Sequence, residues 1–150
     1  MDKLRVMRTS SDWSRRATRV LAWAAVVGVS IVIFIAVRYV LDAYWNAERL
    51  KDVQAITVAL RQYAADHKGT YPAGLDADDK QLGSSSTGCE ITTSQCSISI
   101  PSCLDLTREL GPYLAEIPSD PARWGKTRTR YAATVDRDGG LLVTACDYSK

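Results

Sequence analysis

The sequence predicts an α+β fold, in which a long N-terminal helix spans a membrane and continues as an amphipathic helix packed on a small C-terminal antiparallel sheet. Three observations support this fold class. Residues 20–37 contain no charged side chain, neither Pro nor Gly interrupts residues 38–68, and two β-favouring runs lie near the C-terminal end. The helix and the sheet each have an apolar face, so we expect each face to cover the other.

The first element is a membrane-spanning helix at residues 20–38. At 1.5 Å per residue, the uncharged run 20–37 extends over about 27 Å, close to the roughly 30 Å hydrocarbon core of a bilayer. A buried core helix rarely stays uncharged over this length, and the apolar region of a cleaved signal peptide is usually shorter. Bulky Tyr44 and Trp45 follow where a signal peptidase needs small residues. We therefore expect a retained anchor.

Charges on either side of the anchor predict its orientation. Residues 1–19 form a basic tail, in which Asp2 and Asp12 stand against Lys3, Arg5, Arg8, Arg15, Arg16 and Arg19. Basic residues that flank a span stay on the cytoplasmic side. We expect a single-pass protein of the cell membrane, with a cytoplasmic N-terminus and with residues 39–150 as an extracytoplasmic domain. Topology already accounts for the basic tail, so nucleic acid is not an expected partner.

All four cysteines lie in the predicted extracytoplasmic domain, at Cys89, Cys96, Cys103 and Cys146. This distribution predicts two disulfides formed in an oxidising compartment. A zinc site is the alternative, but the spacing lacks a C-x2-C pair and the single histidine, His67, lies far upstream. Three connectivities are possible. We favour Cys89 with Cys96 and Cys103 with Cys146, because the second bridge would tie the last strand to the middle of the domain.

The helix beyond the membrane has an apolar stripe that predicts the core of the domain. Its residues recur at steps of three and four, at Val53, Ile56, Leu60 and Tyr63. The helix is expected to end at about residue 68, where Gly69 suits a left-handed cap and Pro72 prevents continuation. His67 is then a residue of the helix end, not a ligand or a base.

The remaining elements are short. Residues 74–88 have the polar, small composition of a loop, and residues 89–100 favour one or two short extended stretches. Ser102 and Asp105 resemble a capping box that opens a helix at residues 103–110. Residues 131–135 and 141–146 are β-favouring runs around a loop that contains Gly139 and Gly140. They predict a terminal hairpin.

Two segments resemble a known protein family. The first reads Arg49-x-x-Asp52-Val53-x-x-Ile56-x-x-Ala59-Leu60-x-x-Tyr63-x-x-Asp66-x-x-Gly69-x-Tyr71-Pro72. The second reads Leu110-x-x-Tyr113-Leu114-x-x-Ile117-Pro118-x-Asp120-Pro121, followed by Trp124-Gly125 and Tyr131. Their order and spacing resemble type IV pilin-like proteins and the major pseudopilins of type II secretion, over residues 48–146. The resemblance implies a membrane-anchored structural subunit that contacts other envelope, pilus or secretion proteins.

One part of the family pattern is not found. Prepilins have a Gly followed by a Phe-Thr-Leu-Ile-Glu-like start, whereas here Gly28 lies in the middle of the apolar run and is followed by Val29-Ser30-Ile31-Val32-Ile33. We therefore expect a pilin-like domain on an ordinary signal anchor. Ala24 and Gly28 form a small-x-x-x-small pair, which favours close packing of two anchors and hence self-association.

The side chains do not favour an enzyme. A nucleophile and a base must converge, but the chain has one histidine and its cysteines are assigned to disulfides. We expect no catalytic residue and no cofactor. Asp120, between two prolines, is expected to have a structural role in a turn. Asp136 and Asp138 are weak candidates for a calcium site in the hairpin loop.

A second functional class stays open, a stand-alone extracytoplasmic binding module for glycan or DNA. Lys126, Arg128 and Arg130 alternate with threonines and would supply a basic strand edge. Such a charge run also serves to deter the pairing of edge strands.

Overall fold

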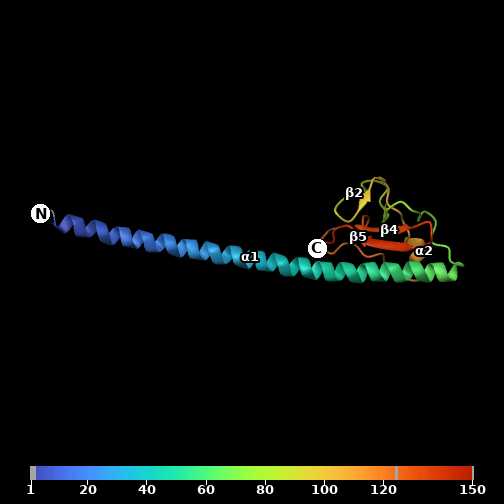
Figure 1. Cartoon of the computed structure of the whole chain (residues 1–150), viewed down its shortest axis with the longest axis horizontal. Coiled ribbons are helices and arrows are strands. Elements are labelled where there is room, and N and C mark those ends of the chain that lie inside the picture. The colour runs from blue at the N-terminus through green and yellow to red at the C-terminus, as the bar shows by residue number, and fades with distance from the viewer. Residues whose placement is uncertain (1–2, 124, 150) are drawn as a thin grey trace. The chain divides into compact units, whose positions relative to one another are not determined.

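The structure is a computed structural model that describes residues 3–123 and 125–149, with side-chain surroundings from residue 17 onward. The chain divides into two compact units, Met1–Asp42 and Ala43–Lys150. One helix, α1 (Lys3–Asp66), contributes to both units. The fold is therefore α+β, with one long N-terminal helix and a small antiparallel sheet (Figure 1). The basic side chains expected between residues 1 and 16, and Trp124, lie outside the described side chains.

The first unit consists of helix α1 up to Asp42. Within Ala17–Asp66, an 18-residue window has a mean hydropathy of 2.8 and no buried residue, so the helix is long and apolar enough to cross a membrane. Its large apolar side chains are exposed, with Trp23 at 71% and Phe34 at 65%. A methyl group added at Gly28 would meet no atom within 4 Å, so this side of the helix is open.

The second unit contains a three-stranded antiparallel sheet in the order β1-β4-β5. The strands are β1 (Lys80–Gln81), β4 (Tyr131–Val135) and β5 (Leu141–Ala145). Strands β4 and β5 form the expected terminal hairpin and lie alongside the green end of α1 in Figure 1. A second pair, β2 (Ile91–Thr92) and β3 (Ser97–Ile98), confirms the short extended stretches expected at residues 89–100.

The domain core lies between α1 and the inner face of the sheet. Ile56 and Leu60 are fully buried, and Val53 and Tyr63 pack against the same cluster, so all four residues of the expected stripe contact the core. The sheet side of this cluster consists of Tyr131, Ala133, Val143 and Ala145. These residues alternate along β4 and β5, as expected for strands with one face toward a helix.

The outer face of the same sheet is also covered. Ala132, whose side chain points away from Tyr131 and Ala133, packs with Cys146 and with the hairpin residues Ile91 and Ile98. Strand β4 is therefore buried on both faces, with α1 on one side and the β2–β3 hairpin on the other.

The end of α1 differs in detail from the prediction. The helix ends at Asp66, and Lys68, not Gly69, is the first residue in the left-handed region, with φ of 58° followed by 87° at Gly69. The N–H of Gly69 donates to the carbonyl of Ala64 at 2.7 Å, which satisfies an orphan carbonyl of the last turn. His67 stacks on Tyr63 with ring centroids 3.8 Å apart, as a helix-end residue.

Two other local predictions are wrong. The short helix α2 covers only Thr107–Leu110, and its N-cap is Leu106, which forms no side-chain cap. Ser102 therefore does not open this helix, although the carboxylate of Asp105 accepts the N–H of Thr107 at 3.0 Å. The segment 74–88, expected to be loop throughout, contains β1 because Lys80 and Gln81 pair with β4.

The expected disulfide pairing is also wrong. The bridges join Cys89 to Cys103 and Cys96 to Cys146. Residues 82 and 104 form an isolated bridge, and the N–H of Cys103 donates to the carbonyl of Ser85 at 2.9 Å. This pairing brings Cys103 to Cys89. Cys96 lies between β2 and β3, over the outer face of the sheet, where it meets the end of β5.

Candidate functional site

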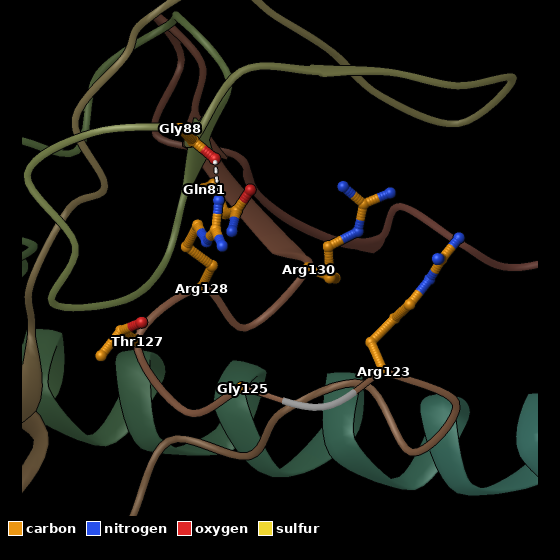
Figure 2. Close-up of a pocket in the computed structure, with 7 residues that line it drawn as sticks. All are labelled: Gln81, Gly88, Arg123, Gly125, Thr127, Arg128 and Arg130. Carbon is orange, nitrogen blue, oxygen red and sulfur yellow. Dashed lines mark hydrogen bonds between the residues drawn. The ribbon is translucent and has the colours of Figure 1, made fainter.

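A pocket lined by arginines lies in the second unit (Figure 2). Its volume is about 290 Å³. We call it the arginine pocket, and its lining residues are Gln81, Gly88, Arg123, Gly125, Thr127, Arg128 and Arg130. Among the described residues, three guanidinium groups and no carboxylate line it, so its chemistry favours an anion.

Strand pairing places Gln81 at the floor of the pocket. Gln81 pairs with Ala132, so its side chain lies on the outer face of the sheet with Ala132. Only 1% of Gln81 is exposed. Its amide Oε1 and Nε2 form no hydrogen bond with any residue that the structure describes. A buried amide without partners costs about 1–3 kcal/mol, so a donor and an acceptor from beyond the described residues would stabilise this side chain.

Arg128 forms one wall with the help of a glycine. Its Nη1 donates to the carbonyl of Gly88 at 3.4 Å, the dashed line in Figure 2. Gly88 has φ of 73°, and a methyl group added there would lie 2.7 Å from the same nitrogen. A residue with a side chain at position 88 would be strained and would displace the guanidinium, so Gly88 is needed for this wall.

Arg130 and Arg123 share one carboxylate. Arg130 donates from Nη2 to Asp147 Oδ1 at 2.6 Å and from Nε to Oδ2 at 2.9 Å, while Arg123 Nε reaches Oδ2 at 3.3 Å. The hydrogen bond from Arg130 lowers the pKa of Asp147 below its ordinary value. Arg128 pairs with no carboxylate in the described part of the chain. The pocket therefore keeps an excess of positive charge.

The backbone around the pocket is held in place by pairing with neighbouring segments. Leu82 N–H donates to the carbonyl of Tyr131 at 2.8 Å, and the Thr129 hydroxyl donates to the carbonyl of Leu82 at 2.7 Å. Arg130 has φ of 68°, in the left-handed region that a residue with a side chain rarely adopts. Such conformations persist only where the surroundings enforce them, and they gather at functional sites.

A separate group of polar contacts fastens α1 to the rest of the domain. Arg49 donates from Nε and Nη2 to the two carboxylate oxygens of Asp120, at 2.6 and 3.0 Å. The two side chains are 6% and 0% exposed. Tyr131 Oη donates to Asp52 at 2.6 Å, and Asn46 Nδ2 donates to the carbonyl of Ser149 at 2.7 Å. We call these three contacts the helix clasp.

The helix clasp explains the role of Asp120. The carboxylate accepts the N–H of Ala122 at 2.9 Å, which is the turn role expected from the sequence, and it also neutralises Arg49. Burial raises the pKa of Asp52, and burial likewise raises that of Tyr131. Both shifts have the direction expected for groups withdrawn from water.

The structure brings together some of the expected site residues and separates others. Residues 126–130 form no strand, so the expected basic strand edge is wrong, because this segment turns around the pocket instead. Arg128 and Arg130 line the pocket, whereas Lys126 pairs with Glu116 at the exposed surface. Gln81 and Arg123 belong to the pocket but followed no pattern that the sequence showed.

Of the two hairpin aspartates, Asp136 has a structural role. Asp136 Oδ1 accepts the N–H groups of Asp138 and Gly140, at 2.9 and 2.6 Å, and so closes the turn between β4 and β5. Among the described residues, no group of three or more His, Cys, Asp or Glu could hold a metal ion.

Comparison with protein-family models, curated proteins and solved structures finds no match for this chain.

Proposed function

We propose that the chain is a non-enzymatic, single-pass, pilin-like subunit that displays an extracytoplasmic domain and acts through contacts with other envelope, pilus or secretion proteins. The observation that carries the proposal is the continuity of α1, which contains the candidate membrane span and also supplies Ile56 and Leu60 to the domain core. A subunit built in this way connects its anchor to its domain through one continuous helix.

The helix clasp supports the same proposal. Arg49 and Asp52 lie on α1 just beyond the span and bind groups from distant parts of the domain. A buried, two-pronged contact between arginine and carboxylate defines geometry more strictly than apolar packing does. The domain therefore keeps its place on α1 when a partner binds it.

The anchor offers a route to self-association. The helix face at Gly28 is open, and Ala24 lies one turn before it. Two helices pack closely where small residues recur at this spacing. We propose that copies of the chain pair through Ala24 and Gly28 in the membrane.

Crosslinking of the full chain in its membrane tests this function. The wild type should yield dimers or larger assemblies, and Gly28→Leu should reduce their yield because the larger side chain separates the helices. Gly28→Ala is the matched control and should keep the yield, since alanine is also small. Imaging of the protein purified in mild detergent then shows whether the assemblies are filaments. A wild type that stays monomeric at every crosslinker concentration would contradict the proposal.

A further inference from the structure

We propose that the arginine pocket binds an acidic sugar unit, meaning a sugar ring that carries a carboxylate or a phosphate group. The inference goes beyond the proposed function, because the pocket lies in the domain and none of its residues belongs to the anchor or to the helix clasp. It rests on two needs of the pocket that no described residue meets, one for negative charge and one for hydrogen-bond partners at Gln81.

The need for negative charge comes from the arginines. Within the described ranges, Arg128 has only the carbonyl of Gly88 as a partner, at the long distance of 3.4 Å. Arg123 is 65% exposed and holds Asp147 through a single contact at 3.3 Å. Both guanidinium groups therefore keep free donors at the pocket. A planar guanidinium presents these donors as a fork that matches a carboxylate or a phosphate.

The need for a hydroxyl group comes from Gln81. Its Nε2 requires an acceptor, but its Oε1 requires a donor, and an ionised carboxylate offers acceptors alone. Figure 2 shows the Gln81 amide and the Arg128 guanidinium in the same pocket. A ligand that satisfies both must carry an anionic group and a neighbouring hydroxyl. Sugar acids and sugar phosphates have both groups on one ring.

The volume of the pocket and the net charge of the domain favour a single sugar unit over nucleic acid as the ligand. The volume of about 290 Å³ lies at the lower end of the roughly 300–1,000 Å³ found for small-molecule sites, which suits one ring. Residues 43–150 carry 12 Lys and Arg against 14 Asp and Glu, which leaves a net charge of −2. A surface for DNA is a basic stripe that contacts many phosphates, whereas here three arginines gather at one pocket of a domain that is acidic as a whole.

Each disulfide has a cysteine that is adjacent in sequence to a residue of the pocket or to the carboxylate that binds its arginines. Cys89 follows the wall residue Gly88, and its partner Cys103 lies beside Ser85. Cys146 precedes Asp147, the carboxylate that orients Arg130 and Arg123. A site held in place before the ligand arrives loses less entropy on binding.

Calorimetry on the full chain, in nanodiscs of zwitterionic lipid without sugar detergent, tests the inference. The probes are glucuronate and glucose 6-phosphate, with glucose, which lacks the anionic group, and acetate, which lacks the hydroxyl group, as controls. We expect at least one acidic sugar to bind at least about tenfold more tightly than both controls, since each unmet polar group costs roughly 1.4 kcal/mol or more. Equal binding of an acidic sugar and its matched control, or no binding of either acidic sugar, would overturn the inference.

Variants assign the binding to the pocket. Arg128→Gln should weaken binding of the acidic sugar at least about tenfold, while Lys126→Gln, which removes the same charge outside the pocket, should leave it unchanged. Gln81→Leu should remove the preference for glucuronate over acetate. The melting temperature of each variant separates loss of binding from loss of folding. Binding that survives both Arg128→Gln and Gln81→Leu in folded protein would refute the site.

Two further probes identify the source of the ligand. An oligogalacturonate that binds more tightly than galacturonate would indicate a polymeric acidic glycan, while equal affinity per chain end would indicate a free or terminal unit. Duplex DNA that binds more tightly than either, with an affinity that falls steeply with salt and depends on Arg128, would overturn the sugar in favour of nucleic acid. None of these results changes the crosslinking test of the anchor, so the two proposals can fail separately.

Discussion

At the scale of the residue, the pair formed by Arg49 and Asp120 shows how a buried charge is accommodated in a small domain. Neither side chain is more than 6% exposed, and Asp120 accepts hydrogen bonds from Arg49 and from the N–H of Ala122. Taking either charge out of water alone is costly, so each depends on the other. The pair contributes geometry more than net stability, because apolar residues of similar volume can fill such a site equally well.

Removal of one partner should therefore be severe. Arg49→Met leaves Asp120 buried without a counter-charge, and we expect the free energy of unfolding to fall by about 3–5 kcal/mol. Lys51→Met is the matched control, because Lys51 is 69% exposed in its pair with Glu48 and should cost about 0–1 kcal/mol. Denaturant unfolding of the full chain in detergent measures both. A loss as small as that of the control would show that water reaches Asp120.

The shifted pKa of Asp147 predicts how stability depends on pH. Its pKa in the folded protein lies below the ordinary aspartate value of 3.8, chiefly because Arg130 donates a hydrogen bond to the carboxylate. This carboxylate therefore stabilises the fold above that pH, and its contribution is lost as the pH falls through the lower, folded pKa. Asp147→Asn should lower the stability at pH 7 and make the loss in acid shallower.

Thermal melts of the full chain between pH 7 and pH 2 check this expectation. Asp138→Asn is the control, since this exposed residue forms no ion pair within the described ranges. It should leave the acid profile close to that of the wild type. An unchanged profile in Asp147→Asn would exclude the pair with Arg130 as a source of stability.

At the scale of the element, the length of a pattern decided what could be predicted from the sequence. The helix stripe extends from Val53 to Tyr63 and the hairpin strands have five residues each, so their periodicities are visible. Strand β1 has two residues, too few for an alternation to show. Because β1 could not be predicted, the approach of Cys103 to Cys89 could not be predicted either. That approach depends on hydrogen bonds between residues 81–85 and residues 103–104.

The arginine pocket was harder to predict than the fold. Arg128 and Arg130 alternate with threonines, a pattern that predicts a strand edge. Their segment turns around the pocket instead and forms no strand. Gln81 lies more than forty residues earlier and reaches the pocket only through the pairing of β1 with β4. A site assembled from short segments that are distant along the chain leaves no local pattern in the sequence.

The two disulfides should contribute unequally to stability. Their sequence separations are 14 and 50 residues, for which loop-closure entropy gives about 3 and about 4 kcal/mol. We expect the double variant Cys96→Ala with Cys146→Ala to melt at a lower temperature than Cys89→Ala with Cys103→Ala. Non-reducing peptide mapping of each variant should show the other bridge intact. The reverse order of melting temperatures would mean that strain or packing outweighs loop entropy.

At the scale of the whole molecule, the N-terminal tail and the domain have net charges of opposite sign. The tail is basic, whereas residues 43–150 have a net charge of −2. Loops with excess Lys and Arg remain in the cytoplasm, and disulfides persist in oxidising compartments outside it. On both grounds we propose that the domain lies on the extracytoplasmic side, and the two properties arise from residues that are far apart in the sequence.

Neutralising the tail should therefore change the orientation and the disulfides together. In the triple variant Arg15→Gln, Arg16→Gln and Arg19→Gln, we expect a larger fraction of chains to insert with the domain in the cytoplasm. The inverted chains should resist protease added to intact cells and should carry free thiols, because the cytoplasm keeps cysteines reduced. Alkylation with a mass-shifting maleimide under non-reducing conditions counts those thiols. Removal of three exposed charges from the domain, in Arg61→Gln, Lys126→Gln and Arg137→Gln, is the control and should change neither readout. Free thiols in the wild type, with a domain protected from protease, would reverse the orientation proposed here.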